Sequence, residues 1–483
     1  MMYRLYHSLI VACVVVSMMF VGCKKAEEKS FEIPSESILI EVGHAGDMGT
    51  TSFKSHNISA IDVVSVVAGW EVVEIDLSSK SITVKSPSMF DNDEKRSGTI
   101  SLAGYTPLGT KVSISLYVAI LDNPDVDLRQ SPANCYIANK PATRYLFNPY
   151  VGGNSVALDT EYIEIIWQTT NDIIKYVDLQ DGVASFYVEE LTDDDDKPQG
   201  KLQEGNALIG AYDAAGELLW SWHIWLTNSD PERETVVLNG RELMNINLGA
   251  DCNSQGEKDK DKIGRSYGMY YQWGRRTPIV GPQDWRFSMN ADMLVYKGSG
   301  AYLYFDYVAS DATVGSVEWA ESNPTSIIVG CKSNNYDWMF EGHDDALWST
   351  TSKSDHDPCP AGWRIPDSSI YEGLTISSVD DELSWQEAQG MYGWNLVDQN
   401  SGSYFFSAAG RRNYLDGHLD IVNDDEVRPV PWSGYYWTAT AVADGDAHAM
   451  FFDLNSATRT WNGFDAQRKM HRANAMPVRC VRE

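Results

Sequence analysis

Basic residues are scarce in this sequence, and the short motifs that mark most enzymes are missing. The chain has 38 Lys and Arg against 68 Asp and Glu, which gives a net charge of -30 at pH 7. A surface of this sign repels phosphate backbones and anionic lipid heads, so we expect no nucleic-acid partner. No His-Glu-x-x-His, no Gly-x-Ser-x-Gly and no phosphate-binding glycine loop occurs. The sequence therefore predicts no catalytic residue and no cofactor.

Metal-ligand spacing is missing as well. The nine histidines are scattered, and no two cysteines have the short spacing of a zinc or redox site. The loops His343-Asp344-Asp345 and Asp355-His356-Asp357 place carboxylates beside an imidazole, an arrangement that could serve acid–base chemistry or a metal. Chance placement in so acidic a chain explains them too, and we predict no metal site.

Long apolar runs are confined to the N-terminus. The run Leu9 to Gly22 follows a single basic residue, Arg4, and is shorter than the roughly 20 residues of a membrane-spanning helix. It predicts a signal peptide over residues 1–22. The sequence Phe20-Val21-Gly22-Cys23 resembles a bacterial lipobox, which implies lipid on Cys23, a tether over residues 23–34 and a place on the outer membrane facing the cell exterior. The alternative is an ordinary signal peptide followed by an incidental cysteine.

Without these 22 residues the chain would still exceed one hydrophobic core, and we expect several domains. Strand-like alternation is clearest at Lys111 to Ile120, where every second residue is apolar, and it recurs at Ser81 to Lys85 and Gly98 to Leu102. Residues 35–121 are therefore predicted to form a small β-sandwich. Trp70 and Ser97-Gly98-Thr99-Ile100 resemble the immunoglobulin-like modules of Bacteroidetes surface proteins.

A second, β-rich domain is predicted over residues 122–244, after the break at Asp122-Asn123-Pro124-Asp125. Its strands are expected at Tyr162 to Trp167, Gly182 to Val188 and Leu218 to Thr227. The last of these is apolar on both faces, which favours a strand covered on both sides over a sugar-binding row of tryptophans.

Residues 245–483 form the third predicted domain, with long loops and one helix expected around Asp380 to Gly390. Four motifs follow one another there: Asn247-Leu248-Gly249-Ala250, Tyr271-Gln272-Trp273-Gly274, Asp357-Pro358-Cys359-Pro360 and Arg479-Cys480-Val481. This order resembles the "major paralogous" domain of Bacteroidetes and Fibrobacteres surface lipoproteins. The resemblance implies an α+β fold like that of C-type lectins, in a chain that is mainly β and multidomain. Two upstream segments, Ala133-Asn134-Cys135-Tyr136-Ile137 and Trp220-Ser221-Trp222-His223-Ile224-Trp225, resemble segments of fimbrial tip and accessory proteins.

One cysteine pair is singled out. Pro358 and Pro360 restrict the backbone on both sides of Cys359, and such a stiff turn suits a cross-link. Cys480 is the natural partner, because a bridge there ties down the last strand. A loop of ~100 residues closed in this way gains about 4.7 kcal/mol in the chain-entropy model. Two buried thiols are the alternative.

The function expected is that of a binding protein. Calcium-dependent sugar binding is not supported, since Trp461-Asn462-Gly463 lacks an acidic ligand. We hypothesise an adhesin or fimbria-associated lipoprotein that binds a glycan or a host or bacterial surface protein, with fimbrial subunits added by strand addition. A glycan-processing enzyme or nutrient-capture accessory lipoprotein is the alternative. The candidate ligand contacts, which core packing explains equally well, are the loop aromatics Tyr414, Trp432, Trp461 and Phe464.

Overall fold

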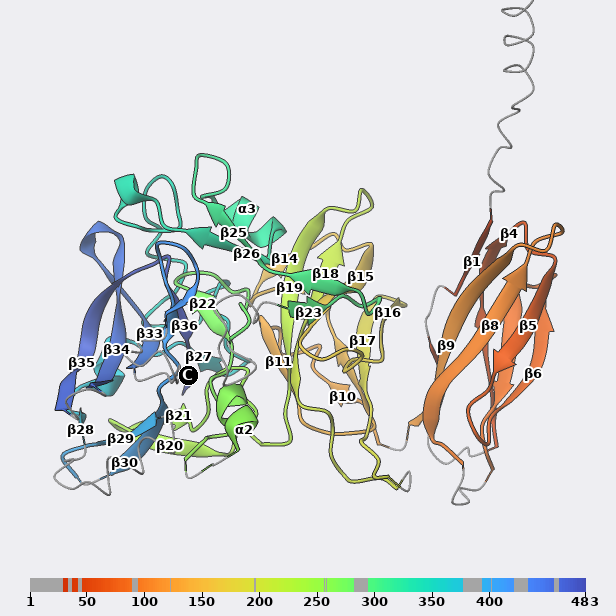
Figure 1. The fold of residues 1–483 in the computed structure, drawn as a ribbon, viewed down its shortest axis with the longest axis horizontal. Helices are drawn as coiled ribbons and strands as arrows, with labels where there is room; N and C mark the ends of the chain where they lie inside the picture. The colour runs from red at the N-terminus through yellow and green to blue at the C-terminus, as the bar shows by residue number, and fades with distance from the viewer. Residues whose placement is uncertain are drawn as a thin grey trace, which may run out of the picture. The chain divides into compact units, whose positions relative to one another are not determined.

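A computed structural model of the chain describes residues 29–33, 37–41, 46–88, 94–121, 123–194, 197–255, 257, 259–281, 294–376, 393–400, 402–420, 433–455 and 460–483 (Figure 1). The chain divides into two compact units, the first comprising Met1–Ile40 and His44–Ala119 and the second Glu41–Gly43 and Ile120–Glu483. Strands dominate both units, so the mainly β, multidomain class predicted from the sequence is confirmed.

The first unit is a β-sandwich. Its strands are β1 (Ser30–Glu32), β2 (Ser37–Glu41), β3 (Met48–Ser52), β4 (Lys54–His56), β5 (Ala60–Ser65), β6 (Glu71–Asp76), β7 (Ser81–Lys85), β8 (Ser97–Tyr105) and β9 (Lys111–Leu121). A four-stranded sheet has the order β2-β9-β8-β5 and a three-stranded sheet the order β3-β7-β6, while β1 pairs with β4. A sheet of four strands against one of three, with antiparallel pairing of β5 with β8, β8 with β9, and β7 with β3 and β6, is an immunoglobulin-like arrangement.

The core of this unit follows from strand alternation. Ile100 and Leu102 of β8 are buried, as are Leu116 of β9 and Ile82 and Val84 of β7. Residues two apart in a strand share a face, so these apolar side chains line the interior of the sandwich. The strands predicted at Ser81 to Lys85 and Lys111 to Ile120 are confirmed.

The second unit begins with two sheets that cover each other. Its first strands are β10 (Val126–Asp127), β11 (Cys135–Ala138), β12 (Thr143–Phe147), β13 (Val151–Gly152), β14 (Val156–Ala157), β15 (Tyr162–Gln168), β16 (Tyr176–Gln180), β17 (Val183–Val188), β18 (Gly205–Tyr212), β19 (Leu218–Leu226), β20 (Thr235–Leu238) and β21 (Arg241–Met244). One sheet has the order β10-β12-β17-β16. The other, β11-β19-β18-β15-β23-β24, takes its last two strands from later in the chain: β23 (Leu294–Tyr296) and β24 (Tyr302–Tyr304).

Strand β19 separates two hydrophobic cores. Trp222 on one face packs into a cluster with Phe147 and Phe186, whereas Trp225 on the other face packs into a cluster with Trp273 and Trp363. The expectation of a strand covered on both faces is confirmed, because all three tryptophans of β19 are buried. They are core residues and offer no row of rings to a sugar.

The rest of the second unit is built from short strands and loops. Its elements are α2 (Lys260–Arg265), β22 (Tyr270–Gln272), β25 (Asp306–Ala309), α3 (Val317–Ser322), β26 (Ser326–Val329), η1 (Lys332–Asn334), β27 (Trp363–Arg364), η2 (Ser368–Tyr371), β28 (Thr375–Ile376), β29 (Gly393–Val397), β30 (Ser403–Ser407), β31 (Arg411–Arg412), β32 (Leu419–Asp420), β33 (Ser433–Val442), η3 (Ala443–Gly445), β34 (Asp446–Asn455), β35 (Thr460–His471), β36 (Ala475–Pro477) and β37 (Val481–Arg482). The longest strands here form the three-stranded sheet β33-β34-β35 (Figure 1).

The sequence predicts a domain boundary between residues 244 and 245. Strand β15 lies before this point and β23 after it, yet the two strands pair with each other and belong to one compact unit. The domain boundaries themselves stay a prediction. The helix expected around Asp380 to Gly390 lies outside the described residues, and so does Cys23 with the rest of the N-terminal segment. Within the described ranges no helix has the length and apolar character needed to cross a membrane.

Candidate functional site

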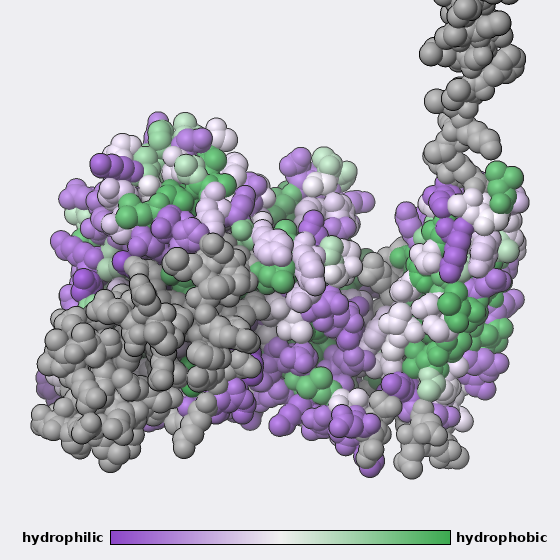
Figure 2. Space-filling model, in the orientation of Figure 1, coloured by the Kyte–Doolittle hydropathy of each residue, from purple (hydrophilic) through white to green (hydrophobic). Residues whose placement is uncertain are grey.

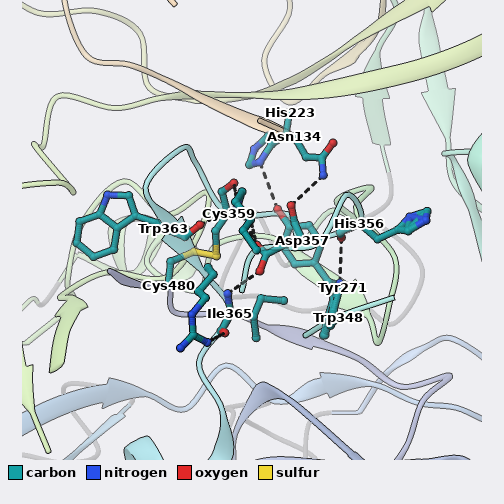
Figure 3. The surroundings of a disulfide bond; sticks show 12 residues. Asn134, His223, Tyr271, Trp348, His356, Asp357, Cys359, Trp363, Ile365 and Cys480 are labelled. Atoms are coloured by element: carbon teal, nitrogen blue, oxygen red, sulfur yellow. Dashed lines mark hydrogen bonds and ion pairs between the residues drawn. A yellow bond between two sulfur atoms is a disulfide. The ribbon is translucent and has the colours of Figure 1, made fainter. Parts of the chain in front are cut away.

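The motifs noted in the sequence meet around one disulfide. Cys359 and Cys480, the pair expected from the sequence, are joined across 121 residues of chain. Figure 3 shows Tyr271, His223 and Asn134 around this bond, so residues of five separate motifs surround it. Cys135, Cys252 and Cys331 are free thiols. The motif residues therefore pack together in the interior around the disulfide, and this packing accounts for their presence in the sequence.

Asp357 holds the turn that carries Cys359. Its carboxylate is fully buried and accepts hydrogen bonds from the backbone N–H of Cys359 at 2.9 Å and of Ile365 at 2.8 Å (Figure 3). The Lys353 ammonium lies 3.1 Å from the same carboxylate and also donates to the carbonyl oxygens of Cys359 and Trp363. The Lys353 side chain is only 6% exposed, so each charge depends on the other.

Asn134 joins the upstream motif to the same turn. Its side-chain amide donates to the carbonyl oxygens of Asp355 at 2.7 Å and Asp357 at 2.9 Å, and its Oδ1 accepts from the Trp220 indole at 3.1 Å. The Arg276 guanidinium stacks on that indole, 3.6 Å from the ring centroid. One buried asparagine thus ties the middle sheet to the loop before the disulfide.

His223 lies in the same interior as a neutral imidazole. Its Nε2 is 2.8 Å from Asn206 Oδ1, an acceptor, and its Nδ1 is 3.2 Å from the Tyr271 hydroxyl. The partners assign the proton to Nε2 and leave Nδ1 to accept from Tyr271. Burial lowers the pKa of His223 from 6.5 to about 3, because the charged form would lose its hydration.

This imidazole predicts a loss of stability in acid. The unfolded chain takes up a proton on His223 below pH 6.5, whereas the folded chain does so only near pH 3, so folding stability falls as the pH drops through that window. Between pH 7 and pH 5 the free energy of unfolding should fall by about 2 kcal/mol more in the native chain than in the His223→Gln variant, because glutamine cannot titrate. Urea unfolding at several pH values measures the difference. Parallel pH curves for the two proteins would contradict the assignment.

The two acidic loops noted in the sequence lie at one open cavity of about 420 Å³. Asp344, Asp355 and His356 line it, together with Asn154 from the middle part of the chain. The Asp355 carboxylate accepts hydrogen bonds from the backbone N–H of Asn154 at 2.9 Å and of Ser155 at 3.2 Å. The Asp355 carboxylate is therefore occupied in holding a turn. The cavity contains residue types that acid–base chemistry uses, but it does not offer two carboxylates that are both free of such hydrogen bonds. No group of metal-binding residues occurs in the described ranges.

His356 has a second environment behind this cavity. Its Nδ1 is 3.2 Å from Glu321 Oε1, and its ring stacks on Trp220. Burial lowers the pKa of His356, although the Glu321 carboxylate opposes the shift. The imidazole of His356 therefore forms part of the cavity wall, between Trp220 and Glu321.

Three half-buried rings form the most ligand-like surface of this region. The Tyr336, Tyr414 and His471 rings, which we call the three-ring cluster, meet with centroids 4.9, 4.5 and 5.2 Å apart. The imidazole of His471 is 28% exposed and lies 2.9 Å from Asp446 Oδ1, which also accepts from the Asn335 amide at 3.1 Å. Partly exposed rings beside fixed polar groups are the usual composition of a ligand site.

The backbone at this cluster is strained. Asn335 and Tyr336 are consecutive residues with φ of 51° and 56°, in the left-handed region that non-glycine residues seldom occupy. The Tyr336 N–H donates to the Cys331 carbonyl at 2.8 Å, and its own carbonyl accepts from Ala473, so the turn is held from both sides. Such strain is retained where a side chain must be placed, and here it places the Tyr336 ring.

Arg472 connects the three-ring cluster to the acidic loop. This buried guanidinium pairs with Asp345, donates to the Asp446 carbonyl at 3.3 Å and stacks on Trp273 at 4.1 Å. Next to it, His343 Nδ1 is 2.9 Å from the buried Asp337 carboxylate, whose pKa is raised by burial. The rings, the acidic loop and the open cavity thus form one continuous region.

The predicted ligand contacts do not come together. Tyr414 lies in the three-ring cluster, whereas Phe464 packs against a different buried cluster, that of Phe406 and Phe452. Trp432 lies outside the described residues, and the side chain of Trp461 is not among those described. Tyr336 and His471 were not predicted. Tyr336 reaches Tyr414 from another loop and His471 from the end of strand β35, and no sequence signal marks that contact.

Comparisons with solved structures give alignments over part of the chain at low TM-scores. No family model matches it, and no curated protein matches it. A chimeric titin Z1Z2 carrying a decorin peptide aligns over 41% of this chain and 95% of its own at 10% identity and a TM-score of 0.15. The D00-D0 domain of intimin aligns over 41% of this chain and 96% of its own, at 10% identity and a TM-score of 0.18. The Ig1-2 module of a Drosophila receptor protein tyrosine phosphatase aligns over 41% of this chain and 99% of its own, at 11% identity and a TM-score of 0.16. At such scores the alignments carry no argument about function, and the immunoglobulin-like assignment rests on the strand pairing of the first unit.

Proposed function

We propose that this chain is a binding protein of the bacterial cell surface, an adhesin or fimbria-associated lipoprotein whose ligand is a glycan or a protein. Lipid on Cys23 would anchor it to the outer membrane, facing the cell exterior, and the first unit would serve as a spacer. The ligand would bind the C-terminal region, to which we assign a lectin-like role and fold from its resemblance to the major paralogous domain. The three-ring cluster is the single observation that carries this proposal.

The chemistry of the cluster favours binding over catalysis. Tyrosine and histidine rings offer apolar faces and polar edges at a low entropic cost, as binding surfaces require. Asn335 and Asp446 beside them are fixed by hydrogen bonds and can orient a polar ligand. A host protein, a bacterial surface protein or a glycan would each suit this set, and fimbrial subunits could join by strand addition.

We expect Tyr414→Ala to weaken ligand binding about tenfold, because it removes one ring of the cluster. Tyr414→Phe should bind like the native chain, since it keeps the edge-to-face contact with His471. Leu415→Ala, at the adjacent residue that is 52% exposed, is the matched control. The measurement is binding to an array of glycans and host proteins, with co-purification of fimbriae. Absence of any bound member and of fimbriae would reject the proposal.

A glycan-processing enzyme is the second candidate, and the open cavity is the observation that favours it. Asp344 and Asp355 both line this cavity, and glycosidases need two carboxylates. Under this alternative, purified protein hydrolyses a polysaccharide and Asp344→Asn abolishes turnover. Binding without any turnover decides for the first proposal.

A further inference from the structure

The hairpin of β23 and β24 exposes tyrosines that the fold does not use. Tyr302 is 64% exposed and Tyr304 is 60% exposed, the largest values for any aromatic residue in the described part of the chain. Strand β24 is the last strand of its six-stranded sheet, so one side of the hairpin pairs with no further strand of that sheet. Two rings left in water at a sheet edge contribute little to the core and need another explanation.

Alternation places these rings on one face. Val295 and Leu303 point into the core, so their neighbours Tyr302 and Tyr304 point outward. Across the hairpin Tyr296 is paired with Tyr302, with ring centroids 5.5 Å apart, and Leu294 is paired with Tyr304. Tyr296, Tyr302 and Tyr304 together form what we call the tyrosine face. Residues two apart in a strand are separated by about 7 Å, so the face offers rings in sequence along the hairpin.

The hairpin has a hydrogen-bonded turn and almost no charge. Its turn is closed by the Lys297 N–H donating to Ala301 and the Gly300 N–H donating to Lys297, and Lys297 is the only charged residue between Leu294 and Tyr304. The exposed amide side chain of Asn171 lies against Gly300, where an added Cβ would be 3.2 Å from its Oδ1. The surface here therefore consists of flat rings, phenol hydroxyls and one amide, and the hairpin contains no carboxylate.

We propose that the tyrosine face is a second binding site, separate from the three-ring cluster, and that it takes a neutral glycan chain lying along the hairpin. The C–H faces of sugar rings pack on aromatic faces, while phenol and amide groups exchange hydrogen bonds with sugar hydroxyls. A nucleic-acid strand would use the same stacking, but the net charge of -30 repels its phosphates. The same net charge disfavours an acidic glycan relative to a neutral one.

An extended peptide is the competing occupant, because an edge strand can accept one by backbone hydrogen bonds. That mode depends on the backbone of β24 and not on its rings. Substitutions that remove the rings and keep the strand therefore separate the two. Threonine is suitable, since its β-branched side chain favours a strand, as the aromatic side chain of tyrosine does.

The experiment is native-gel retardation of the whole chain in four neutral polysaccharides, a β-glucan, an α-glucan, a mannan and a galactomannan, with hyaluronan as an acidic comparison. We expect at least one neutral polysaccharide to retard the native chain. Tyr302→Thr with Tyr304→Thr should weaken this binding about tenfold or more, whereas Tyr302→Phe with Tyr304→Phe should retain it. Tyr150→Thr, at a tyrosine that is 39% exposed elsewhere, is the control, and unchanged thermal unfolding shows that each variant is folded.

Three results would overturn the site: no retardation by any neutral polysaccharide, retardation by hyaluronan alone, or equal retardation of the Thr variant and the native chain. Tyr414→Ala distinguishes this inference from the proposed function. If Tyr414→Ala abolishes retardation and the Thr variant does not, the three-ring cluster binds and the tyrosine face is rejected. The reverse result assigns the glycan to the tyrosine face alone.

Discussion

Replacing Asp357 with alanine is expected to destabilise the second unit by about 3–5 kcal/mol, because it leaves the buried Lys353 ammonium without its carboxylate. The same change leaves the backbone N–H groups of Cys359 and Ile365 without their acceptor. The measurement is urea unfolding at neutral pH under non-reducing conditions, followed by tryptophan fluorescence.

A double variant tests the cause. Asp357→Ala with Lys353→Met removes both buried charges, and we expect it to be more stable than Asp357→Ala alone. Glu341→Ala, at an exposed residue, should unfold like the native chain. If Asp357→Ala unfolds at the native urea concentration, or if Lys353→Met adds no recovery, then the ion pair does not hold this turn.

Loss of the disulfide is expected to cost about 2–5 kcal/mol. The bond closes a long loop that ends almost at the C-terminus, so its absence gives the unfolded chain more freedom and lets β37 leave its place between β21 and β27. Cys359→Ala with Cys480→Ala removes both sulfurs and avoids a lone buried thiol. Thermal unfolding of this variant and of the native chain, with and without reductant, measures the effect.

Reductant provides the internal control. It should lower the midpoint of the native chain toward that of the double-alanine variant and leave the variant unchanged. Since Asp357 accepts a hydrogen bond from Cys359, the effects of Asp357→Ala and of the disulfide should not add. A reductant that shifts both proteins equally would mean that reduction of the Cys359–Cys480 bond is not the cause of the shift.

Local patterns predicted the strands well. At β7 and β19 the alternation or the apolar run predicts both the strand and its covered faces, because side-chain direction in a strand depends only on position. At β9 the alternation predicts the strand but only one covered face, whereas the residues from Leu116 to Leu121 are buried on both faces. The prolines around Cys359 likewise indicated a stiff turn, a property of the residues themselves. These features need no knowledge of distant parts of the chain.

The candidate site could not be predicted in the same way. Tyr336 and Tyr414 lie in two separate loops and His471 ends strand β35, so their contact depends on how β33, β34 and β35 pack against the rest of the second unit. Tyr414 was named among four loop aromatics, but the pattern that selected it also selected Phe464, which packs elsewhere. Aromatic residues suit both cores and surfaces, so residue type alone does not separate them.

The sequence by itself determined the acidic charge, the β-rich class and the strands with strict alternation, since each depends on composition or on neighbours within a few residues. The prolines made Cys359 a candidate for a cross-link, but Cys480 lies 121 residues away, so the bond itself depends on the fold. Only the tertiary structure decided that the ordered motifs converge on one buried disulfide and that the tryptophans of β19 are core. It also left Tyr302 and Tyr304 in water. The physical reason is that burial depends on what covers a side chain, and in this unit the covering residues lie far away in the chain.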